Sequence, residues 1–319
     1  MDSAPGWDAV DASLRRLYPG QEPLHWGTLV RYSLGGPDPL DGISCYASQA
    51  ERPHWHFCSF GMSELYAKES DDPDVSGWGF EFTFRIPRAS PSPPSWPLVM
   101  LNDLARYVFQ TGNVFEVGHH VAMGEALPEP GCALDRLVFA LDPELGELET
   151  PNGRLAFLQI VAIHRDEEDV IKRWNSHGLL DLLQVRSPLL ITEFDRPSVL
   201  SDPAALRAVE EGAAREGSAQ ASLYGTGVHF RLTPPTLTLP PAVAGDVQRL
   251  LLSRIRFGRN FVVKGQDLSV VFLPGDRLSW ERNEDGLVLL IPSDRLDELS
   301  EGLEAGRYRG FAGLSVEVS

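Results

Sequence analysis

Residues 53–66 read PHWHFCSFGMSELY, and residues 77–85 read GWGFEFTFR. The first stretch opens with a run of aromatic and apolar residues, which predicts a strand over 54–60. In the second stretch three phenylalanines alternate with polar residues, and this period of two predicts a strand over 79–86. We expect the phenylalanine face of that strand to lie in the core and its polar face to contact water.

Three further blocks keep a fixed order around these two. They are LGGPDPLD (34–41), LARYVFQ (104–110) and TPNG (150–153), the last leading into FLQIV (157–161). In order and rough spacing, the five blocks together closely resemble the suppressor of fused family. The resemblance implies a protein that binds protein partners and has no established catalysis.

Hydrophobic periodicity and turn residues give the coarse organisation of the chain. The small-residue run at 217–222 separates a larger first domain (1–222) from a smaller second domain (223–319). We predict an α+β protein in which each domain has a mixed or antiparallel sheet with packed helices. The expected helices are 7–18, 96–110, 165–174, 178–183, 202–216, 242–256 and 293–303. Besides the two strands above, we expect strands at 27–34, 155–163, 189–192, 228–232, 261–263, 268–272, 287–291 and 314–318.

Charge is concentrated in the first domain. The chain has a net charge of −17, and its first 222 residues contain 33 acidic and 17 basic side chains. Nucleic acid is an unfavourable partner for such a surface, because phosphate binding needs basic patches. A basic protein would be attracted to it and steered toward it.

Several features favour a cytoplasmic location. The three cysteines are odd in number and lack a Cys-x-x-Cys spacing, which is typical of a reducing compartment. The acidic N-terminus has no apolar core of the kind found in a signal peptide. No apolar run of about 18 residues is present, so we expect no membrane span.

His54 and His56 fall on one face of the predicted strand, where two imidazoles could share a metal ion. A metal-dependent or other hydrolase built on them is therefore an alternative function. No cluster of Asp or Glu at ligand spacing accompanies them, and the Gly-x-Ser-x-Gly turn of many serine hydrolases is absent. We predict that both histidines are structural, that the protein is not an enzyme, and that it needs no cofactor.

An acidic loop spans residues 64–74 and contains Glu64, Glu69, Asp71, Asp72 and Asp74. One interpretation is a mobile, solvated loop. The other is an acidic rim beside Tyr66, since tyrosine offers a large rigid surface with one polar group and is favoured in binding hot spots.

The family resemblance implies a specific site. Its animal members hold a short peptide of a zinc-finger transcription factor between their two domains as an added β-strand. Tyr66 falls on a tyrosine that lines this groove, and the strand around Phe230 matches the second domain's contribution. We therefore predict a partner-binding groove lined by Tyr66 and Phe230, with Asp71, Asp72 and Asp74 at its rim.

The sequence says less about the identity of the partner than about the position of the site. The sequence around 68–75 does not align residue by residue with the animal loop, and the long insertion of animal members is absent. Only 3 of the 28 basic residues are Lys, which favours a GC-rich bacterial source. Bacterial relatives are associated, by resemblance, with immunity proteins that neutralise toxins. A chaperone-like scaffold for an endogenous client is a further alternative.

Overall fold

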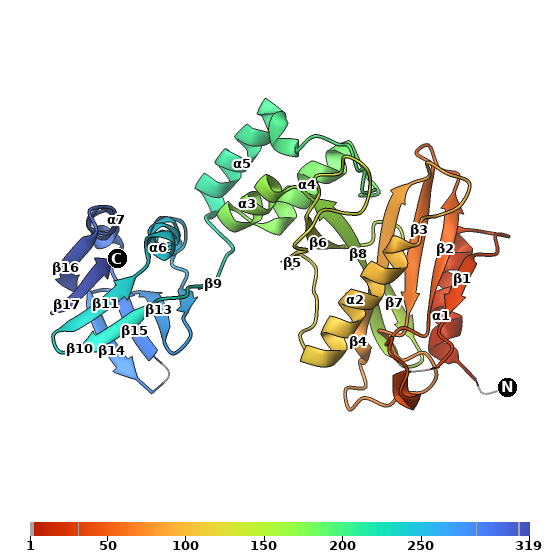
Figure 1. The fold of residues 1–319 in the computed structure, drawn as a ribbon, viewed down its shortest axis with the longest axis horizontal. Helices are drawn as coiled ribbons and strands as arrows, with labels where there is room; N and C mark the ends of the chain where they lie inside the picture. The colour runs from red at the N-terminus through yellow and green to blue at the C-terminus, as the bar shows by residue number, and fades with distance from the viewer. Residues whose placement is uncertain (1–2, 31, 285, 312) are drawn as a thin grey trace. The chain divides into compact units, whose positions relative to one another are not determined.

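The computed structural model describes residues 3–30, 32–284, 286–311 and 313–319 (Figure 1). The chain forms two compact units, Met1–Glu168 with Leu180–Ser201 and Asp169–Leu179 with Asp202–Ser319. Each unit combines sheets with packed helices, so the predicted α+β class is confirmed. The helices are α1 (Pro5–Leu17), α2 (Trp96–Thr111), α3 (Arg165–Arg173), α4 (Ser176–Arg186), α5 (Pro203–Glu216), α6 (Pro241–Ser253) and α7 (Leu296–Glu304).

The sheet of the first unit has the strand order β1-β2-β3-β4-β8-β6-β5, and β7 also pairs with β8. Its strands β4 and β8 run parallel, while the other pairs are antiparallel. The strands are β1 (Leu24–Gly27), β2 (Gly42–Ser48), β3 (His54–Phe60), β4 (Val75–Pro87), β5 (His120–Ala122), β6 (Arg136–Leu141), β7 (Glu147–Thr150) and β8 (Gly153–Ile163).

Both faces of this sheet are buried. The phenylalanines of β4 pack with Leu101 and Ala105 of α2, as the alternating pattern predicts. On the other face Val10 and Leu14 of α1 pack over β2, β3 and β8. The expectation that the polar face of β4 contacts water is therefore wrong. Glu81, Thr83 and Arg85 all have an exposed fraction of 0%.

Two of the expected strands are also wrong. In the segment 27–34 the strand ends at Gly27 and Tyr32–Leu34 is a short 3₁₀ helix, while residue 31 lies outside the described residues. Turn-forming glycines and prolines follow at once, and they favour a short helical turn over an extended strand. The segment 189–192 forms no strand, although Gln159 of β8 binds its Leu189 carbonyl at 2.9 Å.

The second unit contains two sheets. One has the order β10-β11-β17-β16 and the other the order β14-β15-β13-β12-β9. Their apolar inner faces form one core with α6 and α7, which includes Val247, Leu250 and Leu299. The strands are β9 (Ser222–Tyr224), β10 (His229–Leu232), β11 (Pro235–Leu239), β12 (Phe261–Lys264), β13 (Ser269–Pro274), β14 (Ser279–Asn283), β15 (Gly286–Ile291), β16 (Arg307–Phe311) and β17 (Leu314–Val318).

The domain boundary expected at residue 222 stays a prediction, and limited proteolysis would test it. Nearby, Asp202 caps α5 as the sequence predicts, because its side chain accepts a hydrogen bond from the Ala204 amide at 2.8 Å. Within the described residues, no helix combines the length and hydrophobicity needed to cross a bilayer.

Candidate functional site

The turn that carries Tyr66 is built around the buried carboxylate of Glu81. This side chain projects from β4 and accepts hydrogen bonds from the Gly61 amide (3.0 Å) and from the amide and hydroxyl of Ser63 (2.9 and 2.6 Å). The Ser59 hydroxyl donates a further bond at 2.5 Å. The pKa of Glu81 is raised above its ordinary value, because burial outweighs the opposing effect of these hydrogen bonds. The polar face of β4 thus fixes the chain between β3 and Tyr66.

A second carboxylate, that of Glu64, organises the acidic loop. It accepts hydrogen bonds from the Lys68 ammonium (2.8 Å), the Ser70 amide (2.5 Å) and the Gly77 amide (3.1 Å). Although partial burial acts to raise it, these donors lower the pKa of Glu64 to about 2. The ends of the loop are therefore tied to one ionised side chain. This arrangement is at odds with the interpretation of a freely mobile loop.

Other sequence blocks meet at the same place. Asn152 of the TPNG block donates its side-chain amide to the Glu64 carbonyl at 2.7 Å. The Trp7 amide of α1 donates to the Leu65 carbonyl at 3.1 Å. Gly6 has no room for a side chain, since a Cβ there would lie 2.1 Å from the Glu64 carbonyl oxygen. Segments far apart in the chain therefore hold the Tyr66 turn in place.

Tyr66 is half-buried and lines a cleft of about 430 Å³ within the first unit. Three other aromatic side chains line it, with ring centroids 5.4 Å apart for Trp78 and Phe109 and 5.3 Å apart for Tyr32 and Phe109. Asp41 and Glu69 also line the cleft, while the Glu64 carboxylate there is already paired with Lys68. An aromatic cleft with carboxylates suits an apolar side chain next to a hydrogen-bond donor or a cation.

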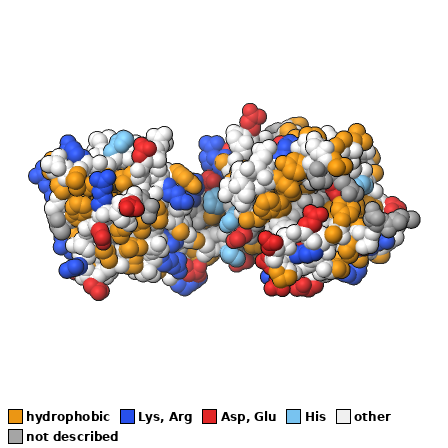
Figure 2. Space-filling model, turned by 90° about the horizontal axis from the view of Figure 1, so that it is seen from below, with side chains coloured by type: hydrophobic (Ala, Val, Ile, Leu, Met, Phe, Trp, Pro, Cys, Tyr) orange, Lys and Arg blue, Asp and Glu red, His pale blue; other side chains and the backbone are white. Residues whose placement is uncertain are grey.

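The predicted rim residues Asp71, Asp72 and Asp74 are exposed on the loop that Glu64 ties down. They do not line the cleft itself. Figure 2 shows acidic side chains beside exposed hydrophobic ones on one face of the first unit. Exposed carboxylates of this kind attract a positively charged partner at long range, while the partner approaches.

Phe230 lies in the second unit, on β10. Its half-buried ring packs on Trp280 with the centroids 5.8 Å apart, and the Arg282 guanidinium carbon lies 5.5 Å from the ring centroid. Among the described strands β10 pairs only with β11. One edge of β10 is therefore open to another strand.

Sequence reasoning missed a second open edge in this unit. β9 pairs only with β12 among the described strands, and its last residue, Tyr224, is 82% exposed. A cavity of about 560 Å³ beside it is lined by Tyr224, Lys172 and Arg249. The available signal is an aromatic residue two positions after the small-residue run at 217–222, the segment predicted as the domain boundary.

His54 and His56 belong to a buried polar network. His56 Nδ1 lies 2.8 Å from the Tyr18 hydroxyl, and its Nε2 lies 3.3 Å from an Asp142 carboxylate oxygen. The same carboxylate accepts two hydrogen bonds from Arg85, at 2.7 and 3.0 Å. His54 Nδ1 lies 2.8 Å from the Arg52 carbonyl.

This network does not offer a reaction site. Both histidines have an exposed fraction of 0%, so a substrate cannot reach them. Burial and the neighbouring Arg85 lower the pKa of His56 to about 4, which leaves it neutral at pH 7. In the described part of the chain, no group of three or more His, Cys, Asp or Glu side chains is placed to hold a metal ion.

Known proteins share this arrangement of elements. The family model described as suppressor of fused protein (SUFU) matches residues 36–197. The suppressor of fused homolog of Mus musculus is 36% identical over an alignment of 268 residues that covers 77% of this chain and 54% of the mouse protein. The Homo sapiens homolog is 38% identical over an alignment of 234 residues that covers 67% of this chain and 48% of the human protein. The chain thus spans about half the length of these relatives.

Two solved structures extend the comparison. The crystal structure of Drosophila Suppressor of Fused matches with a TM-score of 0.86 and 25% identity, over 99% of this chain and 97% of that chain. A chain from the Sufu–Fu complex crystal structure matches with a TM-score of 0.59 and 35% identity, over 65% of this chain and 98% of that chain. The fold and the Tyr66 cleft define a two-domain α+β protein with a preformed aromatic site. The chain belongs to the suppressor of fused family.

Proposed function

We propose that this chain acts by binding another protein, from which it takes up an extended segment. The observation that carries the proposal is the Tyr66 cleft, an aromatic cavity of about 430 Å³ whose walls are fixed by Glu81 and Glu64. A preformed cleft loses little conformational freedom when a partner side chain enters it. The solved Sufu–Fu complex supports the proposal, because it records a related chain with a protein partner.

Open strand edges are the second element of the proposal. An extended segment that pairs with an edge gains backbone hydrogen bonds, and side-chain pockets then add selectivity. The second unit has such edges at β10, with Phe230, and at β9, with Tyr224. The groove between the domains that the resemblance implies stays a prediction.

A basic partner is the finer form of the proposal, and toxin neutralisation is its most specific form. The acidity of the first 222 residues supports both, since complementary charge speeds the capture of a basic protein. Co-expression with a toxin encoded beside this chain tests the immunity role. The expected result is that the chain restores growth and that Tyr66→Ala abolishes this rescue. An endogenous client, with no toxin encoded beside the chain, would instead favour the chaperone-like alternative.

The binding site is tested with the partner identified by affinity capture and mass spectrometry. Tyr66→Ala should weaken binding by about 2 kcal/mol or more in surface-based kinetics, as loss of an aromatic anchor does. Val185→Ala is a matched control, because that side chain is 86% exposed and lies outside the cleft. If Tyr66→Ala folds and binds normally, the cleft is not the site.

Two further comparisons refine the mechanism. Phe230→Ala and Tyr224→Ala, measured separately, distinguish the β10 edge from the β9 edge as the contact in the second unit. Neutralising Asp71, Asp72 and Asp74 should slow association and flatten its dependence on salt, while dissociation changes little. Faster dissociation at constant association would instead mean that these carboxylates touch the bound partner.

A further inference from the structure

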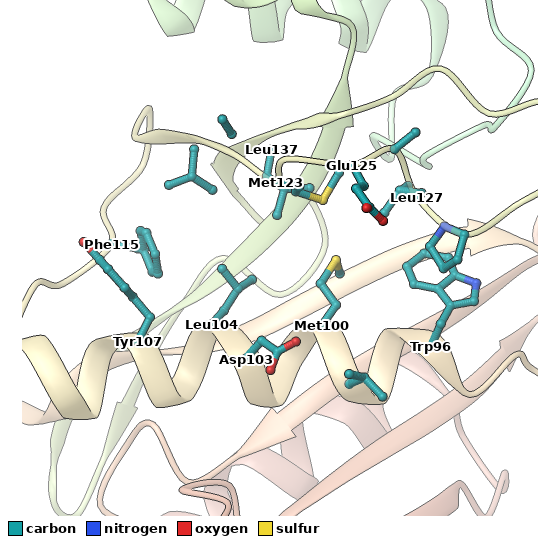
Figure 3. Close-up of a pocket in the computed structure, with 15 residues that line it drawn as sticks. Trp96, Met100, Asp103, Leu104, Tyr107, Phe115, Met123, Glu125, Leu127 and Leu137 are labelled. Atoms are coloured by element: carbon teal, nitrogen blue, oxygen red, sulfur yellow. The ribbon is translucent and has the colours of Figure 1, made fainter.

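An apolar groove of about 650 Å³ lies on the first unit, between α2 and residues 121–128. Figure 3 shows methionine side chains from both walls directed toward each other across it. Of the two carboxylates among its lining residues, that of Asp103 is already paired with Arg106, which leaves Glu125. The groove is thus mainly apolar, and charge does little there to select a partner. One face of the second unit differs in this respect.

The four-stranded sheet β10-β11-β17-β16 of the second unit (Figure 1) has one apolar and one polar face. Leu237, Leu239 and Val316 lie in the core. Because side chains alternate along a strand, the residues between them point to the opposite face. The pairing register places these polar residues in two rows across the sheet, His229–Thr238–Glu317–Arg307 and Arg231–Thr236–Ser315.

Three exposed guanidinium groups gather on this polar face, those of Arg231, Arg307 and Arg309. Arg309 points to the same side as Arg307, because Tyr308 between them lies in the core. Arg307 donates a hydrogen bond to Glu317 at 3.0 Å. This hydrogen bond and the charges of all three arginines lower the pKa of Glu317 below its ordinary value. One negative charge therefore faces three positive ones.

Much of the hydrogen-bonding capacity of this face is unused. Among the described residues, Arg309 has no hydrogen-bond or ion-pair partner. Arg231 makes one long contact, with Nη2 3.4 Å from the Thr236 hydroxyl oxygen. The Ser315 Oγ atom is buried and has no hydrogen-bond partner in the part of the chain that the structure describes. Because a guanidinium has five donors in a geometry that matches a carboxylate, the face can bind acidic groups that it does not itself supply.

The dimensions and the charge of the chain restrict the ligand. Arg231 on β10 and Arg309 on β16 lie three strand spacings apart, about 14 Å along the sheet. A chain with several carboxylates can reach both cations, whereas a single small anion cannot. A long nucleic acid would meet the rest of a protein whose net charge is −17, and phosphate binding needs extended basic patches. A short acidic segment of a protein satisfies both restrictions.

We propose that this polar face is a docking surface for an acidic segment of another protein. Carboxylates of the segment bind Arg231 and Arg309, while Glu317 competes with them for the same cations. The surface belongs to the second unit and the Tyr66 cleft to the first, so either interaction can fail without the other.

The test uses a short rhodamine-labelled peptide in which Glu alternates with Ser, and anisotropy gives its Kd for the full chain. Low ionic strength keeps the exposed charges from being screened. Arg231→Gln and Arg309→Gln should each weaken binding about threefold, as loss of one exposed ion pair does. Arg207→Gln is the matched control and should bind like the parent, because Arg207 is exposed in the same unit but lies on α5.

Glu317→Gln gives a prediction of the opposite sign. It removes the carboxylate that competes for the arginines, so the acidic peptide should bind about threefold more tightly. A purely structural role of Glu317 would leave the affinity unchanged or lower it. A peptide with Gln in place of Glu should bind the parent at least tenfold more weakly, because it carries no charge to pair with the arginines.

Equal binding of the Glu and Gln peptides overturns the proposal, as does full affinity of both Arg231→Gln and Arg309→Gln. Single-stranded DNA that binds more tightly than the peptide, and loses that affinity in Arg231→Gln, would assign the face to nucleic acid instead. Tyr66→Ala should bind the Glu peptide as the parent does. Loss of binding in that variant would place the peptide in the other cleft and also overturn the proposal.

Discussion

The two faces of the sheet in the first unit are both buried, yet they are stabilised in different ways. On the face toward α2, phenylalanines of β4 pack among aliphatic side chains, so burial of apolar area is the main contribution. On the face toward α1, Arg85, His56 and Asp142 lie fully or almost fully buried among apolar neighbours. Burial of charge is unfavourable unless every group is paired. The second face therefore tolerates less change than the first.

The largest effect is expected for Arg85→Met. It leaves the buried Asp142 carboxylate with the Thr83 hydroxyl but without its bidentate partner, which should lower the free energy of unfolding by about 3–5 kcal/mol. Urea denaturation followed by circular dichroism measures this loss. Phe82→Leu on the opposite face should cost less than about 1.5 kcal/mol.

A double variant sharpens this result. Adding Asp142→Asn to Arg85→Met removes the stranded charge, so the pair should be less destabilised than the sum of the two single variants. Additive losses would show that the two side chains contribute independently, contrary to the paired arrangement.

The next effect is a dependence on pH that the buried histidine of the polar face should produce. His56 has a folded-state pKa of about 4 against 6.5 for an ordinary histidine, because burial and Arg85 oppose its protonation. Between these pH values the unfolded chain binds a proton that the folded chain does not. The free energy of unfolding should therefore fall by about 3 kcal/mol as the pH drops from 6.5 to 4.

Stability measured against pH in the parent and in His56→Gln checks this prediction. The variant loses part of the network but should show a flatter profile over that interval. His229→Gln is the matched control, since His229 is exposed in the second unit. A parent profile that is flat from pH 6.5 to 4 would contradict the expected protonation of the unfolded chain.

Glu81→Gln should have an intermediate effect of about 1–3 kcal/mol. One oxygen of Glu81 accepts from three donors and the other from the Ser59 hydroxyl and the Met62 amide, so an amide nitrogen at either position replaces an acceptor by a donor. Because this side chain shapes the Tyr66 turn, hydrogen exchange of the Gly61 and Ser63 amides should also accelerate. Unchanged exchange would show that the turn holds its shape without Glu81.

The smallest effect is expected for Thr83→Val. The Thr83 hydroxyl donates one hydrogen bond to Asp142 at 2.8 Å, while Arg85 continues to bind the same carboxylate. Loss of a single bond should cost about 1 kcal/mol. A cost as large as that of Arg85→Met would mean that the network fails as a whole when any member is lost.

Local patterns predicted much of this fold. The strand at His54–Phe60 has the predicted bounds, and the strand at Leu314–Val318 does too. Helix α2 differs from its expected range by one residue. These segments have strong periodicity or clear end signals, which a single sequence displays directly.

The buried polar face could not be predicted in the same way. Alternation along β4 distinguishes two faces but not what covers the second one. That depends on α1, whose Val10 and Leu14 come from a segment about 70 residues earlier in the chain. Short strands such as β5 and β9 were missed for a related reason, since three residues carry too little periodicity to be distinguished from loop.

The same limit applies to the candidate site. A resemblance to known sequences directed attention to Tyr66. Glu64 was noted only as one acid of the loop, and Glu81 only as part of the polar face of its strand, so the hydrogen bonds by which both shape the surroundings of Tyr66 were not predicted. Their hydrogen bonds go to backbone amides at positions that only the folded chain brings near. Tyr224 was missed because the edge to which it belongs depends on pairing with β12, which is distant in sequence.

The close approach of Gly6 to the Glu64 carbonyl has a consequence for evolution of this site. A Cβ at Gly6 or at Gly77 would meet backbone atoms of residues 62–64, at 2.1 and 2.8 Å. Neither position can accept alanine without moving the Tyr66 turn. New specificities are therefore expected to arise by replacing residues of the exposed stretch 69–74, where side chains can vary, while the frame beneath them stays unchanged.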